Sequence, residues 1–107
     1  MKPVYDATSS LLRAIATRFP DQLLTMEEIR SRTWASATFT GARHELTFRV
    51  EGNGAGAAAD AFLGTLDTAE FSLCGHILAD VALVWEERRD GCDSITISIE
   101  ALTVEDD

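Results

Sequence analysis

The segment from Thr33 to Glu51, TWASATFTGARHELTFRVE, alternates apolar and polar side chains with the period of two that is typical of β-strands. Gly41-Ala42 interrupts this alternation. A Gly at the first position of a two-residue loop favours a type II′ turn, because Gly adopts positive φ without strain. The pattern therefore predicts an antiparallel hairpin that turns at Gly41-Ala42, and a four-residue loop over 40–43 would give the same pairing.

This register separates an apolar face from a polar face, and a slip of one residue would mix them. It pairs Ala35 with Phe48 and places Trp34 directly opposite Arg49. The apolar face collects Ala35, Ala37, Phe39, Leu46, Phe48 and Val50. The polar face carries Trp34 together with Arg30, Arg32, Arg43 and Arg49. His44 falls on the apolar side, where we expect an edge residue with one nitrogen bonded to the backbone.

Two helices are expected before and after this hairpin. Residues 8–19 place Leu11, Leu12, Ile15 and Phe19 on one helical face, with Thr8 or Ser9 as the cap and Pro20 as the stop. Residues 21–32 are ambiguous between a short helix, opened by a capping box at Thr25 and Glu28, and a strand that begins near Glu28. We favour the strand, because the parity of the hairpin then points Ile29 and Ser31 inward.

The stretch GNGAG at 52–56 ends the hairpin, and the following AAADAFLGTL predicts a helix that frays near Gly64. We expect Ala58, Ala61, Phe62 and Thr65 to lie near one side of it. Residues 54–59 match the G-x-G-x-x-A spacing of dinucleotide-binding loops. Because the preceding strand belongs to an antiparallel hairpin, we interpret this stretch as a flexible strand-to-helix turn without a cofactor.

Residues 77–88 and 94–104 predict a second hairpin around Arg89-Asp90-Gly91, with a type I turn and a G1 bulge. This register pairs Trp85 with Ile95 and Leu83 with Ile97 on the apolar face. A bulge near Glu100 would return Leu102 and Val104 to the core. We expect residues 104–107 to form a loose acidic tail.

Taken together, the pattern predicts one small α+β domain over residues 1–107. Its expected architecture is a two-layer α/β sandwich in the order α-β-β-α-β-β, with helices on one face of a mostly antiparallel four-stranded sheet. The sequence leaves open whether the hairpins meet through their inner or their outer strands.

The formal charge of the 107 residues is −9, and it is unevenly distributed along the chain. Residues 1–50 carry +2 and residues 51–107 carry −11. The acidic half argues against nucleic-acid binding, where neutralisation of phosphates supplies most of the affinity. No apolar run approaches the length of a membrane helix and no signal peptide is apparent, so we expect a cytoplasmic protein.

Candidate chemistry is sparse. Cys74 and Cys92 flank a predicted strand and would lie about 40 Å apart, too far for a disulfide. Cys74 and His76 lie close in sequence, but nothing supplies the further ligands that a zinc site requires. No nucleophile, base and orienting group share a recognisable spacing, so we assign no catalytic residue, metal or cofactor.

The leading hypothesis is a non-catalytic protein-association module that acts through its sheet face, as a homodimer or with another protein. Its interface candidates are Trp34, Arg49, Arg32, Arg30 and Arg43, because Trp and Arg are frequent among interface hot spots. One alternative is a small-ligand binding protein with a pocket between sheet and helices, for which His44, His76 and Cys74 are candidates. An enzyme of unknown class is the third hypothesis.

Overall fold

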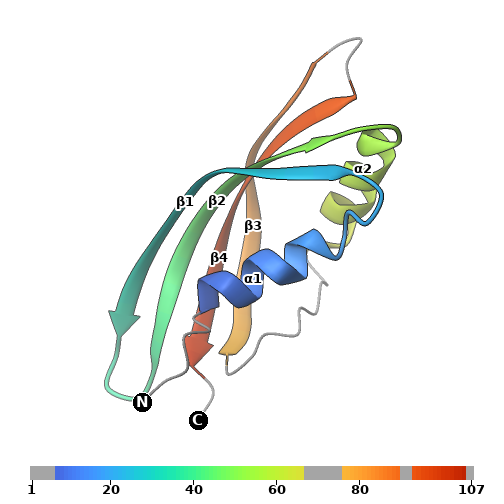
Figure 1. Ribbon diagram of the computed structural model, residues 1–107. Helices are drawn as coiled ribbons and strands as arrows, with labels where there is room; N and C mark the ends of the chain where they lie inside the picture. Colours follow the sequence, from blue (N-terminus) through green and yellow to red (C-terminus); the bar gives the residue numbers. More distant parts are fainter. Residues whose placement is uncertain (1–6, 67–75, 90–92, 106–107) are drawn as a thin grey trace.

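The computed structural model describes residues 7–66, 76–89 and 93–105. Its elements follow the expected α-β-β-α-β-β order: α1 (Ala7–Ala16), β1 (Leu23–Ala35), β2 (Thr40–Glu51), α2 (Ala55–Gly64), β3 (His76–Arg88) and β4 (Ser94–Glu105). The four strands form one antiparallel sheet in the order β1-β2-β4-β3 (Figure 1). The hairpins therefore meet through β2 and β4, the second strand of each.

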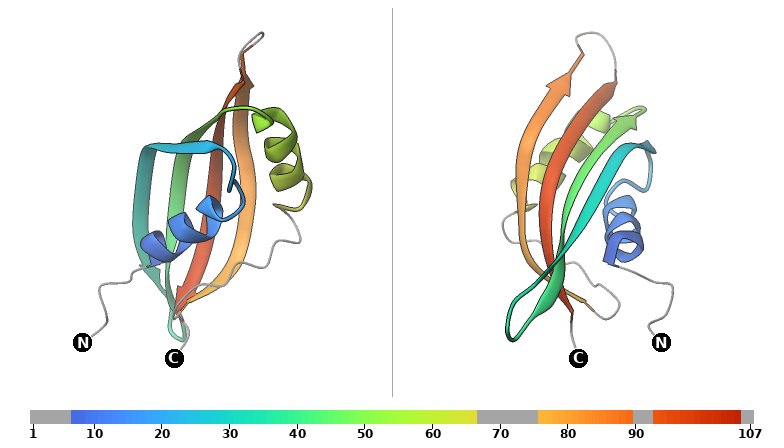
Figure 2. Two further views of the ribbon diagram at one scale, coloured as in Figure 1. Left: turned by 45° about the vertical axis from the view of Figure 1, so that its right-hand side comes forward. Right: turned by 90° about the vertical axis from the view of Figure 1, so that its left-hand side faces the viewer.

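Both helices pack on the same face of this twisted sheet, which confirms the α+β prediction (Figure 2). We call this the covered face and the opposite side the bare face. Alternate residues of the central strands point to the covered face and are buried there. On β2 and β4 these are His44, Leu46, Phe48, Val50, Ile95, Ile97, Ile99, Ala101 and Thr103.

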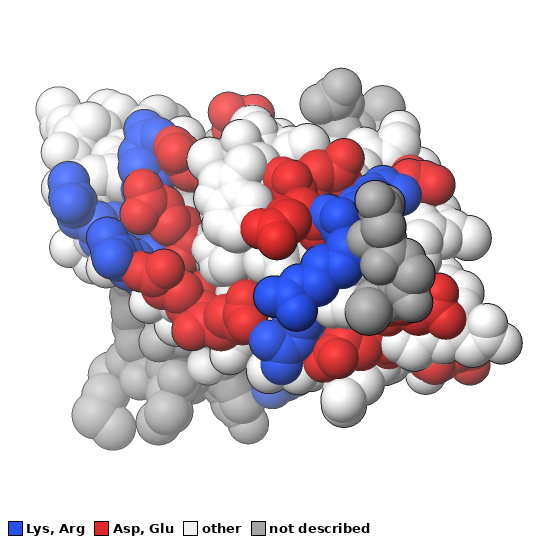
Figure 3. Space-filling model, turned by 90° about the horizontal axis from the view of Figure 1, so that it is seen from above, with Lys and Arg blue, Asp and Glu red and all other residues white. Residues whose placement is uncertain are grey.

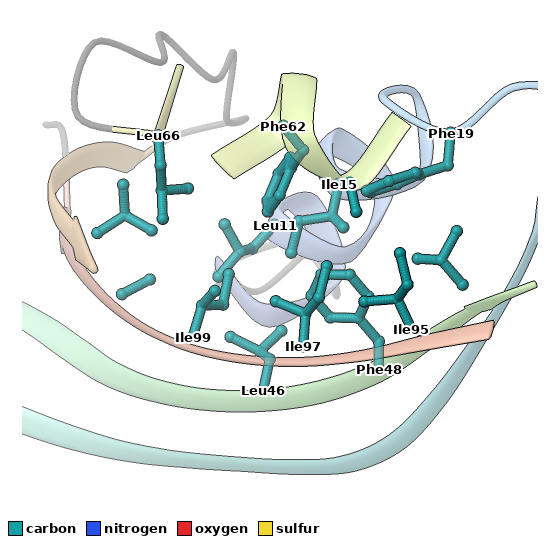
Figure 4. Packing of buried hydrophobic residues seen from close by; sticks show 14 of the residues in the cluster. Leu11, Ile15, Phe19, Leu46, Phe48, Phe62, Leu66, Ile95, Ile97 and Ile99 are labelled. Carbon is teal, nitrogen blue, oxygen red and sulfur yellow. The ribbon is translucent and has the colours of Figure 1, made fainter. Parts of the chain in front are cut away.

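Three aromatic rings join the two layers at the centre of the core. Phe48 of β2 lies 6.0 Å from the ring of Phe62 on α2 and 6.1 Å from that of Phe19, which follows α1. The rings of Phe19 and Phe62 are 5.3 Å apart. Leu11 and Ile15 of α1 pack beside them and are fully buried (Figure 4). Tilted and edge-on ring pairs at these separations add stabilisation beyond the buried area.

The first hairpin turns four residues earlier than its sequence predicts. The loop comprises residues 36–39, and the backbone N–H of Ser36 donates to the carbonyl of Phe39 at 2.8 Å. Gly41 lies within β2 opposite Trp34, and its φ is not positive, so the type II′ turn is wrong. Phe39 is exposed at the loop instead of buried. The faces of β2 nevertheless agree with the prediction.

The strand interpretation of residues 21–32 is confirmed, but β1 begins at Leu23 instead of near Glu28. A bulge at Glu27 lets both Met26 and Ile29 face the same side. The helix alternative for this segment is wrong. Helix α1 begins at Ala7, so Thr8 and Ser9 lie in its first turn instead of capping it, and it ends at Ala16, before Pro20.

Helix α2 ends at Gly64, as expected. Its buried side is formed by Ala55, Ala59 and Phe62, whereas Ala61 is exposed. Gly54 precedes it in the left-handed conformation, with φ of 82°. Because every strand pairing in the described sheet is antiparallel, the Gly-rich turn does not belong to a doubly wound parallel sheet.

The second hairpin differs most from its prediction. Trp85 pairs with Ser98 instead of Ile95, and Leu83 pairs with Ile99 instead of Ile97. Two bulges, at Ala79 and Val84, interrupt β3, while β4 alternates without the bulge expected at Glu100. Thr103 is consequently buried where Leu102 and Val104 were expected. Strand β4 continues to Glu105. Of the expected turn at residues 89–91, residues 90 and 91 lie outside the described residues, as do residues 106–107 of the expected tail.

Candidate functional site

The bare face contains two adjoining hollows. The larger, of about 630 Å³, lies over the ends of β2 and β4 and is lined by Arg49, Glu51, Thr96 and Glu87 among others. The smaller, of about 290 Å³, lies over the middle of the same strands beside Glu45, Thr47, Ser98 and Glu100. Trp85 lines both hollows. This shared position makes Trp85 the central side chain of the bare face.

A bulge places Trp85 there. Between Leu83 and Trp85 the strand carries one extra residue, Val84, against the unbroken β4. The extra residue reverses the alternation, so Leu83 faces the same side as Ile99 whereas Trp85 faces the same side as Ser98. The indole remains 44% exposed and Val84 remains 55% exposed. Sequence reasoning assigned Trp85 to the core, because Leu83-Val84-Trp85 is apolar at all three positions and fits either parity.

Arg49 lies in the wall of the larger hollow and is held by two carboxylates. Its Nε donates to Glu51 at 2.8 Å, and its Nη1 donates to Glu27 at 2.6 Å. The hydrogen bond and the charge of Glu51 raise the pKa of the Arg49 guanidinium above its usual value, and the charge of Glu27 adds to this. Arg49 therefore keeps its charge and is positioned by neighbours on β1 and β2.

The other arginine candidates also lie on the bare face. Arg43 pairs with Glu100 across β2 and β4, and Arg30 pairs with Glu28 at 2.6 Å. Arg32 forms no ion pair with the described residues. Together with Glu45 these arginines line a third hollow of about 160 Å³. The structure thus brings Arg30, Arg32 and Arg43 together, with Arg49 further along the strand.

Trp34 and Arg49 are not opposed, so the predicted pairing between them is wrong. Trp34 pairs with Gly41 and Arg49 pairs with Thr25, which separates them by about 26 Å along β2 at roughly 3.3 Å per residue. The indole of Trp34 covers Gly41 so closely that a Cβ at that glycine would lie 2.8 Å from a ring carbon. Trp34 is only partly exposed, and its Nε1 is buried with no hydrogen-bond partner among the described residues.

Folding removes the separation of charge along the sequence. Strand β2, from the basic half, pairs with β4, from the acidic half. At the end of the edge strand β3, Arg88 donates a hydrogen bond to Asp60 of α2 at 2.5 Å. This hydrogen bond is the main cause that raises the pKa of Arg88. Seen from above, acidic and basic side chains lie beside one another around an uncharged area (Figure 3). On the face seen in Figure 3, charges of both signs are therefore interspersed among the described residues.

Two of the three pocket candidates, His44 and His76, lie within the described residues. His44 is 1% exposed. Its Nδ1 lies 2.8 Å from the hydroxyl of Ser31 and its Nε2 lies 2.9 Å from that of Thr103. In these two contacts His44 bonds to side chains of β1 and β4, whereas the sequence predicted a bond to the backbone. His76 begins β3 at the edge of the sheet, and Cys74 and Cys92 lie outside the described residues.

His44 is part of a small, partly buried polar cluster that connects α1 to the sheet. The Thr8 hydroxyl, in the first turn of α1, lies 2.8 Å from that of Ser31. The Thr103 hydroxyl donates weakly to the carbonyl of Ala42 at 3.4 Å. Both ring nitrogens of His44 therefore have hydroxyl partners, Ser31 at Nδ1 and Thr103 at Nε2. The cluster has an internal partner for each of these groups, which makes it structural.

Within residues 7–66, 76–89 and 93–105, no three His, Cys, Asp or Glu side chains group in a way that could hold a metal ion. Neither α1 nor α2 has the length and apolar character needed to cross a bilayer.

Comparisons with known proteins give one likeness in fold. No protein-family model matches the chain, and no curated protein does. A solved structure described as "Virion of native gene transfer agent (GTA) particle" contains a chain that superposes with a TM-score of 0.64 at 16% sequence identity. The match covers 95% of this chain and 99% of that chain. At this identity the likeness shows a shared fold.

Proposed function

We propose that the chain is a non-catalytic structural subunit that acts by protein association within a virion-like particle. The observation that carries this proposal is the likeness to a chain of a gene transfer agent virion, which extends over nearly the whole of both chains. A match of that extent leaves little of either chain outside the common fold. The same small domain is thus suited to the same kind of role, as one subunit of a larger assembly.

The bare face supports this proposal. It carries hollows, partly exposed apolar side chains at Val84 and Trp85, and arginines, which is the composition that protein interfaces favour. The covered face, by contrast, is occupied by the two helices of the chain itself. A partner protein could therefore bury more exposed side chains on the bare face than on the covered face.

The direct test is whether the chain is recovered with particles. Culture fluid and lysate of the source organism would be separated on a density gradient, and an antibody raised against the purified chain would follow it. We expect the chain in a fast-sedimenting fraction that contains particles by electron microscopy. Recovery only at the top of the gradient, as free protein, would contradict the proposal.

Self-association through the bare face is the homodimer form of the same proposal. Analytical ultracentrifugation from micromolar to near-millimolar concentration should detect a dimer or larger species. Arg32→Glu should weaken it, because Arg32 is exposed on the bare face and has no ion pair there among the described residues. Arg18→Glu, after α1, is the matched control and should leave it unchanged. A clean monomer throughout this range would rule out self-association.

A further inference from the structure

The two hollows on the bare face meet at Trp85 and form an elongated surface. Glu87 lines the larger hollow and Glu45 lines the smaller, so a carboxylate lies on each side of the indole. Trp85 is partly exposed between them, although a regular β3 would have directed it toward the covered face. Bulges commonly redirect a side chain in this way where it serves a site.

The charge lining these hollows is strongly unbalanced. Seven carboxylates and three guanidinium groups line the hollows, and Arg43, the ion-pair partner of Glu100, adds a fourth guanidinium, which leaves an excess of three negative charges. Ion pairs within the chain engage Glu27, Glu28, Glu51 and Glu100. Glu45, Glu87 and Asp93 form no ion pair with any described residue. Unpaired carboxylates on both sides of an exposed indole are complementary to a cation.

We propose that this surface docks an extended basic segment of a partner protein, with an arginine or lysine side chain over the indole of Trp85. The carboxylates of Glu45 and Glu87 bind the neighbouring positive charges. This inference rests on the proposed function, since it names the kind of partner that the bare face receives. The charge of the hollows selects a basic segment over an acidic or apolar one.

Addition of a partner strand to the edge of the sheet is less favourable. The edge strand β3 is exposed along most of its length and carries Ile77, Leu83 and Val84. Its bulges at Ala79 and Val84 break the regular row of backbone groups that a new strand would need. Bulges of this kind are a usual protection against edge-to-edge pairing. The bare face of the sheet is therefore favoured over the β3 edge as the docking surface.

The test uses the purified full chain and a defined probe. The probe is a seven-residue peptide with arginine at alternate positions between glycines, blocked at both ends, and binding is measured by NMR titration at low salt. The matched probe carries neutral citrulline in place of arginine. We expect the arginine peptide to shift resonances of residues around Trp85 and to bind at least about tenfold more tightly than the citrulline peptide.

Variants separate docking from general attraction to an acidic protein. Trp85→Leu should weaken the arginine peptide about two- to fivefold, the range of an exposed cation–π contact. Glu45→Gln combined with Glu87→Gln should weaken it at least as much. Asp80→Asn removes a carboxylate from β3 outside both hollows and should change the affinity less than twofold.

The proposal is overturned if the arginine peptide does not bind, or if all three variants weaken binding equally. The Glu45→Gln/Glu87→Gln variant alters only surface carboxylates, so it decides the outcome even if Trp85→Leu fails to fold. Failure of the peptide to bind would leave recovery of the chain with particles unaffected. Absence of the chain from particles, with normal peptide binding, would instead remove the proposed function.

Discussion

The two faces of the sheet are built from the same strands but differ in what their side chains contact. On the covered face, Phe48, Leu46 and Ile97 are fully buried against α1 and α2. On the bare face, the same strands present hydroxyls such as Thr47 and Ser98, bonded to each other at 3.1 Å, and arginines held by carboxylates. The covered face stabilises the fold, whereas the bare face leaves Trp85 and several charges available. The covered face therefore supplies most of the stability, and the bare face carries the interaction that we propose.

The largest effect should come from the covered face. Phe48→Ala removes the central ring of the aromatic trio, and we expect a loss of about 3–5 kcal/mol in the free energy of unfolding, measured by chemical denaturation. The control on the bare side, Val84→Ala, should change it by less than about 0.5 kcal/mol, because Val84 is largely exposed. Equal losses for the two variants would contradict the division between the faces.

A smaller effect is expected at Gly41 on the bare face, where the backbone of β4 and the indole of Trp34 approach closely. A Cβ at Gly41 would lie 2.0 Å from the carbonyl oxygen of Thr103 and would also meet the indole of Trp34. Gly41→Ala should cost about 1–3 kcal/mol through overpacking and should shift the fluorescence of Trp34.

Gly56→Ala is the matched control for Gly41→Ala. Gly56 lies in α2 with no atom within 4 Å of an added Cβ. We expect it to raise stability by about 0.4–1 kcal/mol, because alanine restricts the unfolded chain without strain in the helix. Two substitutions of the same kind should therefore act in opposite directions. A neutral Gly41→Ala would show that Trp34 does not depend on this glycine.

The smallest effect should come from an ion pair on the bare face. Glu100→Gln removes the partner of Arg43, which is exposed, whereas Glu100 is partly exposed. We expect a change below about 1 kcal/mol that decreases further in 1 M salt, because exposed ion pairs contribute little and salt screens them. Thermal denaturation at low and high salt would measure both. A larger loss would mean that the charged face also carries stability.

The covered face could be predicted from sequence and the bare face only in part. The predicted turn at Gly41 was wrong by four residues, yet Leu46 and Phe48 were assigned correctly, because a shift of four preserves the alternation along each strand. What changed was the pairing, which moved Trp34 from Arg49 to Gly41. Burial determines which side a residue faces, but it does not determine which residue lies opposite.

The second hairpin shows why Trp85 was missed. The bulge at Val84 reverses the alternation of side chains between the two faces of β3. Because residues 83–85 are all apolar, no polar residue in the sequence marks the position of this bulge. The Ser36 hydroxyl, which accepts from the N–H of Phe39 at 3.0 Å, was a local signal for the true first turn. Gly41-Ala42 appeared to be the stronger turn signal, because a glycine in a strand pattern often marks a turn. Gly41 is instead needed for close packing against the indole of Trp34 and the backbone of Thr103, a reason that becomes visible only in the tertiary structure.

Incorporation of variants into particles would show whether the bare face docks a protein there, as we propose. Wild type, Trp85→Glu and the control Phe39→Glu, at the exposed first loop, would each be expressed in the source organism and followed on a density gradient. The account predicts that wild type and Phe39→Glu sediment with particles, while Trp85→Glu remains folded at the top of the gradient. Full incorporation of Trp85→Glu would contradict it.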